Sequence, residues 1–472
     1  MIRELALSDT STAYDVVIVG AGPAGMSAAS ELSALGIKAL VIDDQPSPGG
    51  QIYRNITSSP IPAQTVLGKD YWRGRELVDR FTASNADYLP SSSVWQIEER
   101  AEGLRLYLSR DNRSRRVDTR FAILATGAIE RPFPIAGWTS PGVIGVGAAQ
   151  VLLKSSGLLP SGRTVLLGEG PLLWLYASQM IEAGHTPAHI LSTAESALPP
   201  LSQGGLADFI LSRYALKGAA LVAKVRRATR YSRVTKPRIE QGADGLVVRY
   251  STAGGSEAEI AADTVLVHQG VVPNLNLARA ANCDIAWNEV HACWQPRTDQ
   301  WGTSSLARVS VAGDAAGISG AEAAAVLGRI SALNTAHALG RISEAKRDQM
   351  AAAGFAFVER NRKARHLLDR MYRPSDAMRA GDDDAIICRC EEVTGGQLRA
   401  VLRETQAQGP NQVKAYLRCG MGPCQGRYCN LTVDEIIAQE HQLPRDAVAP
   451  IRIRPPVKPV SLGELASLQD QD

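Results

Sequence analysis

The feature that most constrains the fold is a strand, turn, helix and strand within residues 14–44, YDVVIVGAGPAGMSAASELSALGIKALVIDD. Residues 16–19 form a short apolar run rich in β-branched side chains, which predicts a buried parallel strand. Residues 26–35 predict a helix, and residues 37–42 predict a second apolar strand. The turn between the first strand and the helix has glycines at G-x-G-x-x-G spacing. This order predicts a βαβ unit of the dinucleotide-binding type.

Each glycine of the turn has a mechanical role in such a unit. Gly20 permits the tight turn, Gly22 lets the backbone approach a pyrophosphate, and Gly25 lets the helix pack on the strand. The pyrophosphate then lies at the helix N-terminus, and Asp43 at the end of the second strand binds the ribose hydroxyls, with Asp44 as the alternative. The sequence therefore predicts a dinucleotide site that includes Gly20, Gly22, Pro23, Ala24, Gly25 and Asp43.

Bulk composition limits the class of protein. A chain of 472 residues predicts two to four domains, and 45% hydrophobic with 21% charged residues is ordinary for a globular protein. The net charge of +3 gives no argument for nucleic acid binding. There is no apolar run of about 18 residues that would span a membrane. The first residues lack a signal-peptide pattern. We therefore expect a cytoplasmic protein, with the inner membrane face as a peripheral alternative.

Three further segments narrow the type of dinucleotide site. They are SPGGQIYR (47–54), FAILATGAIERP (121–132) and VSVAGDAAG (309–317). Together with the first turn they resemble flavoproteins with two dinucleotide-binding domains, the pyridine nucleotide-disulfide reductase superfamily. The resemblance implies FAD, with Asp314 accepting a hydrogen bond from the ribityl chain, although a loop aspartate also caps helices well. It adds to the FAD site Gly50, Gln51, Thr126, Gly127, Gly313 and Asp314.

A second glycine turn, in RTVLLGEGPLLWLYASQMIEAGH (163–185), corresponds by this resemblance to the nicotinamide-binding domain. Two departures weaken it. Leu173 stands where the third glycine belongs, and Glu169 places a negative charge where a pyrophosphate would lie. The next strand ends in Ser192 and Thr193 rather than in an acid. We expect an inherited fold whose nucleotide site is weak or lost.

Disulfide chemistry is not indicated. The two dinucleotide-binding units contain only Cys283 and Cys293, which lack the C-x-x-C or C-x4-C spacing of the redox-active pair in this superfamily. We expect them to be ordinary thiols.

Five of the seven cysteines gather near the C-terminus, in ICRCEEV (387–393) and RCGMGPCQGRYC (418–429). Cys388 and Cys390 form a C-x-C, and Cys419 and Cys424 form a C-x4-C. The residues between the pairs predict a compact helical unit, so two loops with two thiols each come together. Four such thiolates suit a [2Fe–2S] cluster, and the segment resembles the bacterioferritin-associated-ferredoxin-like [2Fe–2S] domain.

Two alternatives to this cluster stay open. A structural zinc is one, although four-cysteine zinc sites usually have C-x2–4-C spacing at both ends. A remnant site without metal is the other. Cys429 is a fifth candidate ligand, but we expect it to begin the last helix and to be a bystander.

No constellation of acid, base and nucleophile is evident, and we predict no catalytic residue. The histidines are scattered, and only His268 lies near a predicted cofactor edge. Electron transfer needs aligned cofactors rather than a proton-shuttling triad.

The chain order resembles the A (alpha) subunits of bacterial heteromeric flavin-dependent dehydrogenases, a group that includes opine oxidases, D-hydroxyproline dehydrogenase and hydrogen cyanide synthase. The segments that carry this resemblance are ATGAIERPFPIAGWTSPGVIGVGAAQ, GVVPN and CRCEEVT with RCGMGPCQGRYC. It implies a beta subunit related to amino acid oxidases that holds the substrate, while a small gamma subunit and a quinone as final acceptor stay open. In some relatives FMN lies between the subunits, and in some ATP takes the FAD site.

We therefore expect an α/β protein with two Rossmann-like dinucleotide-binding domains and a small C-terminal helical [2Fe–2S] domain. The expected segments are an FAD domain split over 1–140 and 265–340, an inserted NAD-like domain at 141–264, a helical linker at 341–380, the [2Fe–2S] domain at 381–441 and an extended tail at 442–472. The expected function is electron transfer for an amine dehydrogenase acting on CH–NH donors. The alternatives are a self-contained NAD(P)H-dependent reductase and a non-catalytic nucleotide-binding scaffold.

Overall fold

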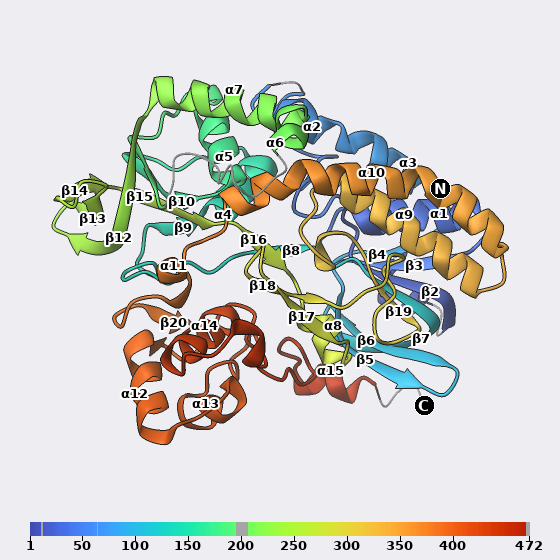
Figure 1. The fold of residues 1–472 in the computed structure, drawn as a ribbon. Coiled ribbons are helices and arrows are strands. Elements are labelled where there is room, and N and C mark those ends of the chain that lie inside the picture. Colours follow the sequence, from blue (N-terminus) through green and yellow to red (C-terminus); the bar gives the residue numbers. More distant parts are fainter. Residues whose placement is uncertain (11–12, 64, 195–205, 469–472) are drawn as a thin grey trace.

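A computed structural model describes residues 1–10, 13–63, 65–194 and 206–468 (Figure 1). The first sheet is mostly parallel, with strand order β1-β4-β3-β2-β7-β6-β5, and β19 pairs with β7. Only β6 and β5 run antiparallel to their neighbours. The strands are β1 (Arg3–Glu4), β2 (Ala13–Val19), β3 (Ala39–Ile42), β4 (Asp87–Leu89), β5 (Ser93–Arg100), β6 (Gly103–Arg110), β7 (Arg113–Leu124) and β19 (Val309–Val311).

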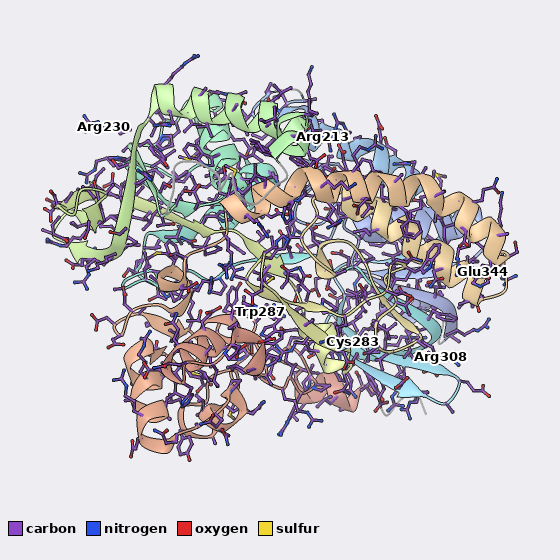
Figure 2. The ribbon with its side chains drawn as sticks, viewed as in Figure 1. Arg213, Arg230, Cys283, Trp287, Arg308 and Glu344 are labelled. Atoms are coloured by element: carbon purple, nitrogen blue, oxygen red, sulfur yellow. The ribbon has the colours of Figure 1, made fainter. Side chains whose placement is uncertain are left out.

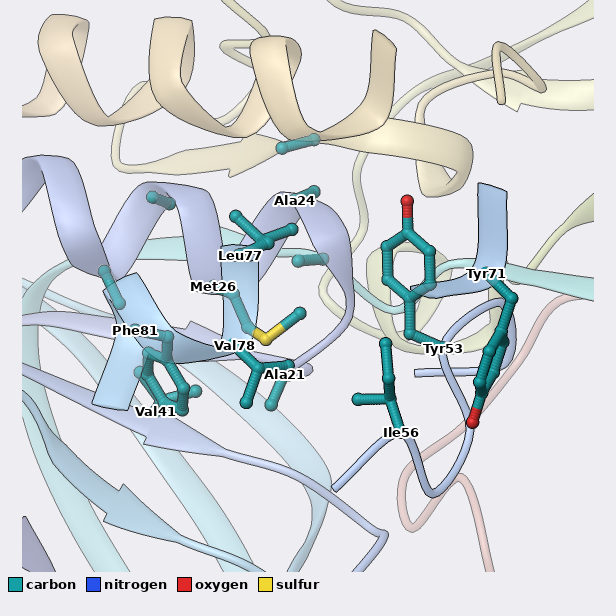
Figure 3. Close-up of a cluster of buried hydrophobic side chains, with 14 of the residues drawn as sticks. Ala21, Ala24, Met26, Val41, Tyr53, Ile56, Tyr71, Leu77, Val78 and Phe81 are labelled. Carbon is teal, nitrogen blue, oxygen red and sulfur yellow. The ribbon is translucent and has the colours of Figure 1, made fainter. Parts of the chain in front are cut away.

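The helices of this unit pack on one face of its sheet. The helix α1 (Pro23–Ala34) lies between α3 (Gly74–Ala83) and α9 (Ala321–Ala338), with α2 (Gly68–Trp72) beside α3. Figure 3 shows the core that results, in which Met26 of α1 and Phe81 of α3 lie near Val41 of β3. These side chains are removed from water, which is the main favourable term in folding. The core fixes the N-terminus of α1 against the ends of the strands.

The second unit has a sheet of order β14-β13-β12-β11-β10-β15-β9, in which the strands from β12 to β9 are parallel. Its helices cover the sheet, and α5 packs on α4 and α7. The strands are β9 (Val143–Gly145), β10 (Thr164–Glu169), β11 (His189–Ser192), β12 (Arg230–Gly242), β13 (Gly245–Thr252), β14 (Glu257–Ala262) and β15 (Thr264–Gln269). The helices are α4 (Val146–Ser156), α5 (Pro171–Glu182), α6 (Leu206–Ile210) and α7 (Arg213–Ala228), the last with Arg213 at its start and Arg230 just beyond its end (Figure 2).

Short ribbons and one long helix connect the two units. β8 (Ala128–Glu130) pairs with β16 (Val271–Pro273), and β17 (Ile285–Asn288) pairs with β18 (Cys293–Pro296). The short helix α8 (Asn276–Ala280) follows β16. The helix α10 (Glu344–Met371) packs on α9 and α6 and runs across both units (Figure 1). This helix lies within the segment 341–380, for which the sequence predicts a helical linker.

The C-terminal unit is small and mostly helical, and it lies below the first two units in Figure 1. It has its own apolar core, formed mainly by α12 and α14. Its elements are α11 (Asp376–Ala380), β20 (Ile386–Cys388), β21 (Val393–Thr394), α12 (Gly395–Thr405), α13 (Pro410–Leu417) and α14 (Asn430–Glu440). Two Rossmann-like units with a helical C-terminal unit confirm the predicted fold class.

A buried polar network fixes the C-terminal unit to the rest of the chain. The Trp294 indole donates to Asp434 Oδ2 at 3.0 Å, and Arg445 Nη2 lies 3.0 Å from the same oxygen. The Arg445 guanidinium also lies 4.4 Å from the centroid of the Trp287 ring, which Figure 2 shows at the junction. The Trp138 indole donates to the carbonyl of Ile386 at 2.7 Å. Buried charges that are paired in this way favour one orientation of the unit.

The tail beyond α14 returns to the first sheet. Ile453, Val457 and Leu468 join the apolar core of that sheet, and Val457 donates its backbone N–H to the carbonyl of Trp95 at 3.0 Å. The predicted extended tail contains one 3-10 turn (Arg445–Ala447) and the short helix α15 (Leu462–Ala466). Among the described residues, none of the helices is long and apolar enough to cross a membrane.

Candidate functional site

The first glycine turn lies where β2 meets α1. Gly20 has φ +109°, and a Cβ there would lie 2.3 Å from the carbonyl oxygen of Ala125. A Cβ on Gly25 would lie 1.8 Å from the carbonyl oxygen of Gly20. Both positions therefore require glycine because backbone approaches backbone. Hydrogen bonds also hold the turn, since the Gly20 N–H donates to the carbonyl of Ile42 at 2.7 Å and the Gly49 N–H donates to that of Ala21 at 2.9 Å.

Gly22 differs, because the protein leaves space beside it. The nearest atom to a Cβ at Gly22 is the Cα of Gly50, at 3.8 Å. Gly22 is the N-cap of α1, and no side chain caps this helix. The first N–H groups of α1 are thus free to bind an anion. Open space and free donors at one helix N-terminus fit the pyrophosphate of FAD.

The structure brings Asp43 to this turn and directs Asp44 away. The buried Asp43 carboxylate accepts the backbone N–H groups of Ala21 and Gln45. Burial raises the pKa of Asp43, and these two hydrogen bonds lower it in part. Asp44 is exposed, accepts from the Ser93 hydroxyl and lies 4.0 Å from Lys458. Asp43 is therefore the better placed of the two for ribose hydroxyls.

The remaining predicted residues gather around the same turn. A Cβ on Gly50 would lie 2.8 Å from the Cα of Gly22, and one on Gly313 would lie 2.8 Å from the Cβ of Ala24. Asp314 Oδ1 accepts the backbone N–H groups of Ser319 (2.9 Å) and Gly320 (3.1 Å), so it fixes the loop that leads into α9. The six predicted residues follow the strands that meet at this turn: Gly50 and Gln51 lie in the loop after β3, Thr126 and Gly127 just after β7, and Gly313 and Asp314 just after β19.

Lys154 is a residue of this region that the sequence did not reveal. It lies on α4 with its side chain buried, and its ammonium donates to the carbonyls of Gln51 (3.2 Å) and Ile52 (3.0 Å) and to Gln150 Oε1 (2.8 Å). Burial lowers its pKa to about 7. Lys154 thus ties the predicted FAD loop to the second unit. A lysine on an amphipathic helix gives no local signal of such a role.

The second glycine turn is occupied by protein carboxylate. Glu169 is buried and accepts from the Ser192 hydroxyl, from the Trp174 indole at 3.2 Å and from the Gly170 N–H at 3.4 Å. Burial raises the pKa of Glu169, and its hydrogen bonds lower it in part. The carboxylate therefore lies at the N-terminus of α5, where a pyrophosphate would bind. Leu173 is buried in the helix at the position of the third glycine.

A second carboxylate lies nearby. Glu130 Oε1 is 2.6 Å from Nδ1 of the buried His268, and the Glu130 carboxylate accepts the backbone N–H of Gly147 at the start of α4. The His268 ring also packs against Gly170, where a Cβ would lie 2.9 Å from Cδ2. His268 is therefore paired within the protein and adjoins the second turn. The N-termini of α4 and α5 both face protein carboxylates.

The two cysteines of the dinucleotide-binding units are separate, free and buried. Cys283 donates weakly to the Ser304 hydroxyl at 3.5 Å. Burial raises the pKa of Cys283, and burial raises that of Cys293 to about 11. Protonated buried thiols are poor nucleophiles, which agrees with the expectation that these residues are ordinary.

The five C-terminal cysteines converge in the C-terminal unit. The Cys388 thiol contacts the thiols of Cys419 and Cys429, and these contacts hold the pKa of Cys388 well below its usual range. The Cys390 thiol contacts Cys424, and burial is the largest cause of its raised pKa. The sequence predicts that Cys429 begins the last helix and stands apart from the cluster. Cys429 is the N-cap of α14, and its thiol contacts the Cys388 thiol.

This arrangement fits a two-iron cluster with cysteine ligands. Among the residues that the structure describes, no three Cys, His, Asp or Glu side chains are disposed to hold one metal ion. The thiols instead form two contacting groups, one around Cys388 and one formed by Cys390 and Cys424. The backbone N–H groups of Glu391 and Gly420 also donate to the Cys388 sulfur. Such donors stabilise thiolates and tune the potential of a [2Fe–2S] cluster.

A short bonded bridge joins the two sites. The Thr126 hydroxyl donates to the carbonyl of Asn274 at 3.0 Å, and the Asn274 N–H donates to the carbonyl of Gly127 at 2.9 Å. Two residues later, the buried Asn276 donates from Nδ2 to the carbonyl of Cys424 at 3.1 Å. The three residues 274–276 thus connect the predicted FAD turn to the loop that carries a predicted cluster ligand.

Comparison with known proteins agrees with this geometry. Residues 14–340 match the family "Pyridine nucleotide-disulphide oxidoreductase", and residues 386–439 match the "BFD-like [2Fe-2S] binding domain". The A subunit of opine oxidase from Agrobacterium tumefaciens (strain Ach5) is 42% identical, over 99% of this chain and 94% of that protein. This chain belongs to the opine oxidase A-subunit family. The family implies FAD and a [2Fe–2S] cluster, so both predicted cofactors are confirmed.

Other relatives extend the A-subunit family. The A subunit of opine oxidase from Rhizobium meliloti (strain 1021) is 40% identical, over 96% of this chain and 99% of that protein. The HcnB subunit of hydrogen cyanide synthase from Pseudomonas aeruginosa is 30% identical, over 88% of this chain and 90% of that protein. The L-proline dehydrogenase from P. horikoshii shares the fold with a TM-score of 0.69 at 18% identity, covering 98% of this chain and 80% of that one. These relatives confirm the resemblance to the A-subunit family that the sequence motifs predict. The chain is one subunit of an oxidoreductase.

Proposed function

We propose that this chain is the electron-transfer subunit of a hetero-oligomeric flavin-dependent dehydrogenase. A partner subunit, related to amino acid oxidases, would oxidise the CH–NH bond of a secondary amine or amino acid, such as an opine, a hydroxyproline or a D-amino acid. The names of the relatives support a complex, because each name refers to one subunit of an enzyme: the A subunit of opine oxidase or the HcnB subunit of hydrogen cyanide synthase. The identity of the substrate and of the partner is part of the proposal.

One observation carries this proposal: residues 274–276 bond both to the Thr126–Gly127 turn and to the Cys424 loop. A chain that only bound a nucleotide would have no need to fix an iron–sulfur unit to that turn. FAD exchanges one or two electrons, and a [2Fe–2S] cluster exchanges one at a time. The residues of the two sites would bind and orient FAD and the cluster. The bridge of residues 274–276 fixes the spacing between the two sites.

The surroundings of the sites support a role without substrate chemistry. His268 is committed to Glu130, and Cys283 and Cys293 are buried protonated thiols. Two hydroxyl–imidazole pairs are present, Ser232 with His189 at 2.9 Å and Thr164 with His185 at 3.0 Å, and both belong to the second unit rather than to the first glycine turn or the C-terminal unit. The substrate site is accordingly assigned to the partner.

The occupied second turn is evidence against the alternative of a self-contained NAD(P)H-dependent reductase. Glu169 and Glu130 place carboxylates at two helix N-termini, and a pyrophosphate would have to displace or neutralise them. We expect NADH and NADPH to leave the flavin of the isolated chain oxidised in a stopped-flow experiment. Rapid bleaching of the flavin would favour the reductase.

Purification with any co-purifying partner tests the proposal directly. We expect flavin absorbance, together with an EPR signal of a reduced [2Fe–2S] cluster after dithionite. Cys388→Ser should remove the cluster absorbance and the iron, whereas Cys283→Ser is the matched control that should keep both. Cys419→Ser and Cys429→Ser should then differ, since Cys388 contacts both thiols and the cluster has four cysteine ligands. A colourless protein with full nucleotide occupancy would favour the scaffold alternative.

A further inference from the structure

The exposed side of the cysteine cluster is surrounded by a basic surface. Of the five C-terminal cysteines, Cys390 is exposed, whereas Cys388, Cys419 and Cys429 are buried. We call the basic rim the side chains of Lys414, Arg418, Arg452, Arg454 and Lys458, which come from α13, the Cys419 loop and the tail. A Cβ on Gly422 would lie 3.2 Å from the Cys390 sulfur, so this loop backbone packs against the exposed thiol.

The geometry of the tail forces two of these arginines outward. Ile451, Ile453 and Val457 are buried, and Arg452 and Arg454 are exposed between them. In an extended segment successive side chains point to opposite sides, so burial of the isoleucines leaves the arginines in solvent. The Arg452 N–H donates to Asn411 Oδ1 at 2.9 Å, which fixes the segment. The positive charges are therefore held by the apolar residues that alternate with them.

The positive charge of the rim is only partly offset. Arg418 Nε lies 3.0 Å from Glu391, and Lys458 Nζ lies 4.0 Å from Asp44. In the described part of the chain, Arg452 and Arg454 form no ion pair. The pKa of Lys414 is lowered by burial and then by the neighbouring Arg454 and Arg452, so these cations are close to one another.

Exposed apolar side chains occur on the same segments as this rim, in α13 and in the Cys419 loop. Tyr416, Met421 and Tyr428 are 60%, 46% and 41% exposed, and Met421 lines a hollow beside the rim. A hollow of about 510 Å³ lies between the Cys419 loop and the tail, with prolines of both segments in its wall. Aromatic residues, methionine and arginine are the types that are enriched at protein interfaces.

We propose that this face is the docking site of a small acidic one-electron carrier protein, which exchanges electrons with the cluster at the Cys390 edge. The inference rests on the proposed relay function. One electron passes from the reduced cluster to the oxidised carrier, so the cluster loses one electron and the carrier gains one; no bond forms or breaks. Redox encounters are typically small and steered by charge, whereas permanent subunit interfaces are larger and depleted in lysine. The rim has two lysines, and three of its cations border a hollow that has Met421 and prolines in its wall.

The test uses the purified holoprotein in complex with its partner, with an acidic flavodoxin as the probe and the basic protein cytochrome c as the mismatched carrier. Flavodoxin binding is measured by calorimetry with both proteins oxidised, and flavodoxin reduction is followed by stopped flow. Arg452→Glu with Arg454→Glu should slow the reduction about tenfold or more at low salt, and the difference from wild type should shrink as salt is added. Arg226→Glu with Arg227→Glu, two exposed arginines at the end of α7, is the matched control and should behave like wild type.

Three results would overturn the docking site. The first is that the Arg452→Glu, Arg454→Glu double variant reduces flavodoxin as fast as the control variant does. The second is that cytochrome c is reduced as fast as flavodoxin. The third is that the double variant separates from its partner subunit in sedimentation experiments. The last result would make the face a subunit interface. The EPR signal of the cluster, recorded for each variant after dithionite, separates these outcomes from failure of the relay itself. A normal signal with no carrier binding refutes the docking site alone, and an absent signal in the wild type refutes the relay.

Discussion

Replacement of Gly22 by alanine should separate cofactor binding from folding. Gly22 has φ −78° and ψ −173°, an extended conformation that alanine adopts without strain. Its Cβ would meet only the Cα of Gly50, at an ordinary contact distance of 3.8 Å. A glycine-to-alanine change at such a position typically raises the free energy of unfolding by about 0.4–1 kcal/mol, because the unfolded chain loses conformational freedom. The apo protein should therefore fold normally.

FAD binding should suffer from the same methyl group. The space beside Gly22 is where the backbone approaches the pyrophosphate, and the added methyl group pushes the phosphates from the N–H groups of α1. A hydrogen bond to a charged group contributes about 1.5–3 kcal/mol. Each bond lost should weaken FAD binding by about tenfold to about a hundredfold, since about 1.4 kcal/mol corresponds to a factor of ten.

The assay is a titration of apo protein with FAD, followed by flavin fluorescence quenching, beside a thermal melt of each apo variant. Gly20→Ala is the contrasting variant, because φ +109° and a 2.3 Å contact with the Ala125 carbonyl oxygen should lower the melting temperature itself. If Gly22→Ala bound FAD as tightly as wild type, the assignment of this turn to the pyrophosphate would be wrong. If Gly22→Ala melted as early as Gly20→Ala, the argument from open space would fail.

Two further predictions concern buried charges. Burial lowers the pKa of Lys154 to about 7, so between about pH 7 and 10 the unfolded chain binds more protons than the folded chain, and stability rises with pH across that window. Denaturant unfolding of wild type and Lys154→Met should therefore differ by an amount that grows in favour of wild type from about pH 7 to about pH 10; a constant difference would contradict the burial argument. Arg445→Met should lower the free energy of unfolding of the C-terminal unit by about 3–5 kcal/mol. The reason is that the substitution removes the guanidinium that pairs with the buried Asp434 carboxylate. Hydrogen exchange of α14 would measure the loss, and an exchange pattern equal to that of wild type would refute it.

The parts of the fold that repeat a local pattern could be predicted from the sequence. The apolar run at 16–19 lies within β2, and the charged helical segment after residue 340 is α10. The predicted start of the first helix, at residue 26, is wrong, because the helix begins at Pro23. Proline suits the first helical position because its missing N–H has no partner there in any case. A glycine N-cap with proline after it is therefore the better signal for this boundary.

Contacts between distant residues could not be predicted in the same way. Lys154 meets the carbonyls of Gln51 and Ile52, and His268 meets Glu130, across long stretches of chain. Cysteine spacing indicated a cluster but did not reveal that Cys429 folds back onto Cys388. The sequence shows which side chains could form a site. Only the packing of the units decides which of them meet.

The two glycine turns show how one architecture can serve two purposes. At the first turn the helix N-terminus is uncapped, and Asp43 binds the turn from the strand side without entering the space beside Gly22. At the second turn the Glu169 carboxylate accepts the N–H of Gly170, the N-cap of α5. Since a carboxylate there supplies within the chain the negative charge that a phosphate would bring, the second unit can fold without a nucleotide. The unit also makes a mechanical contribution, because Lys154 on α4 donates to the carbonyls of Gln51 and Ile52 in the predicted FAD loop. Electrons that reach this chain would then come from the partner rather than from a nicotinamide, which is the direction that the relay requires.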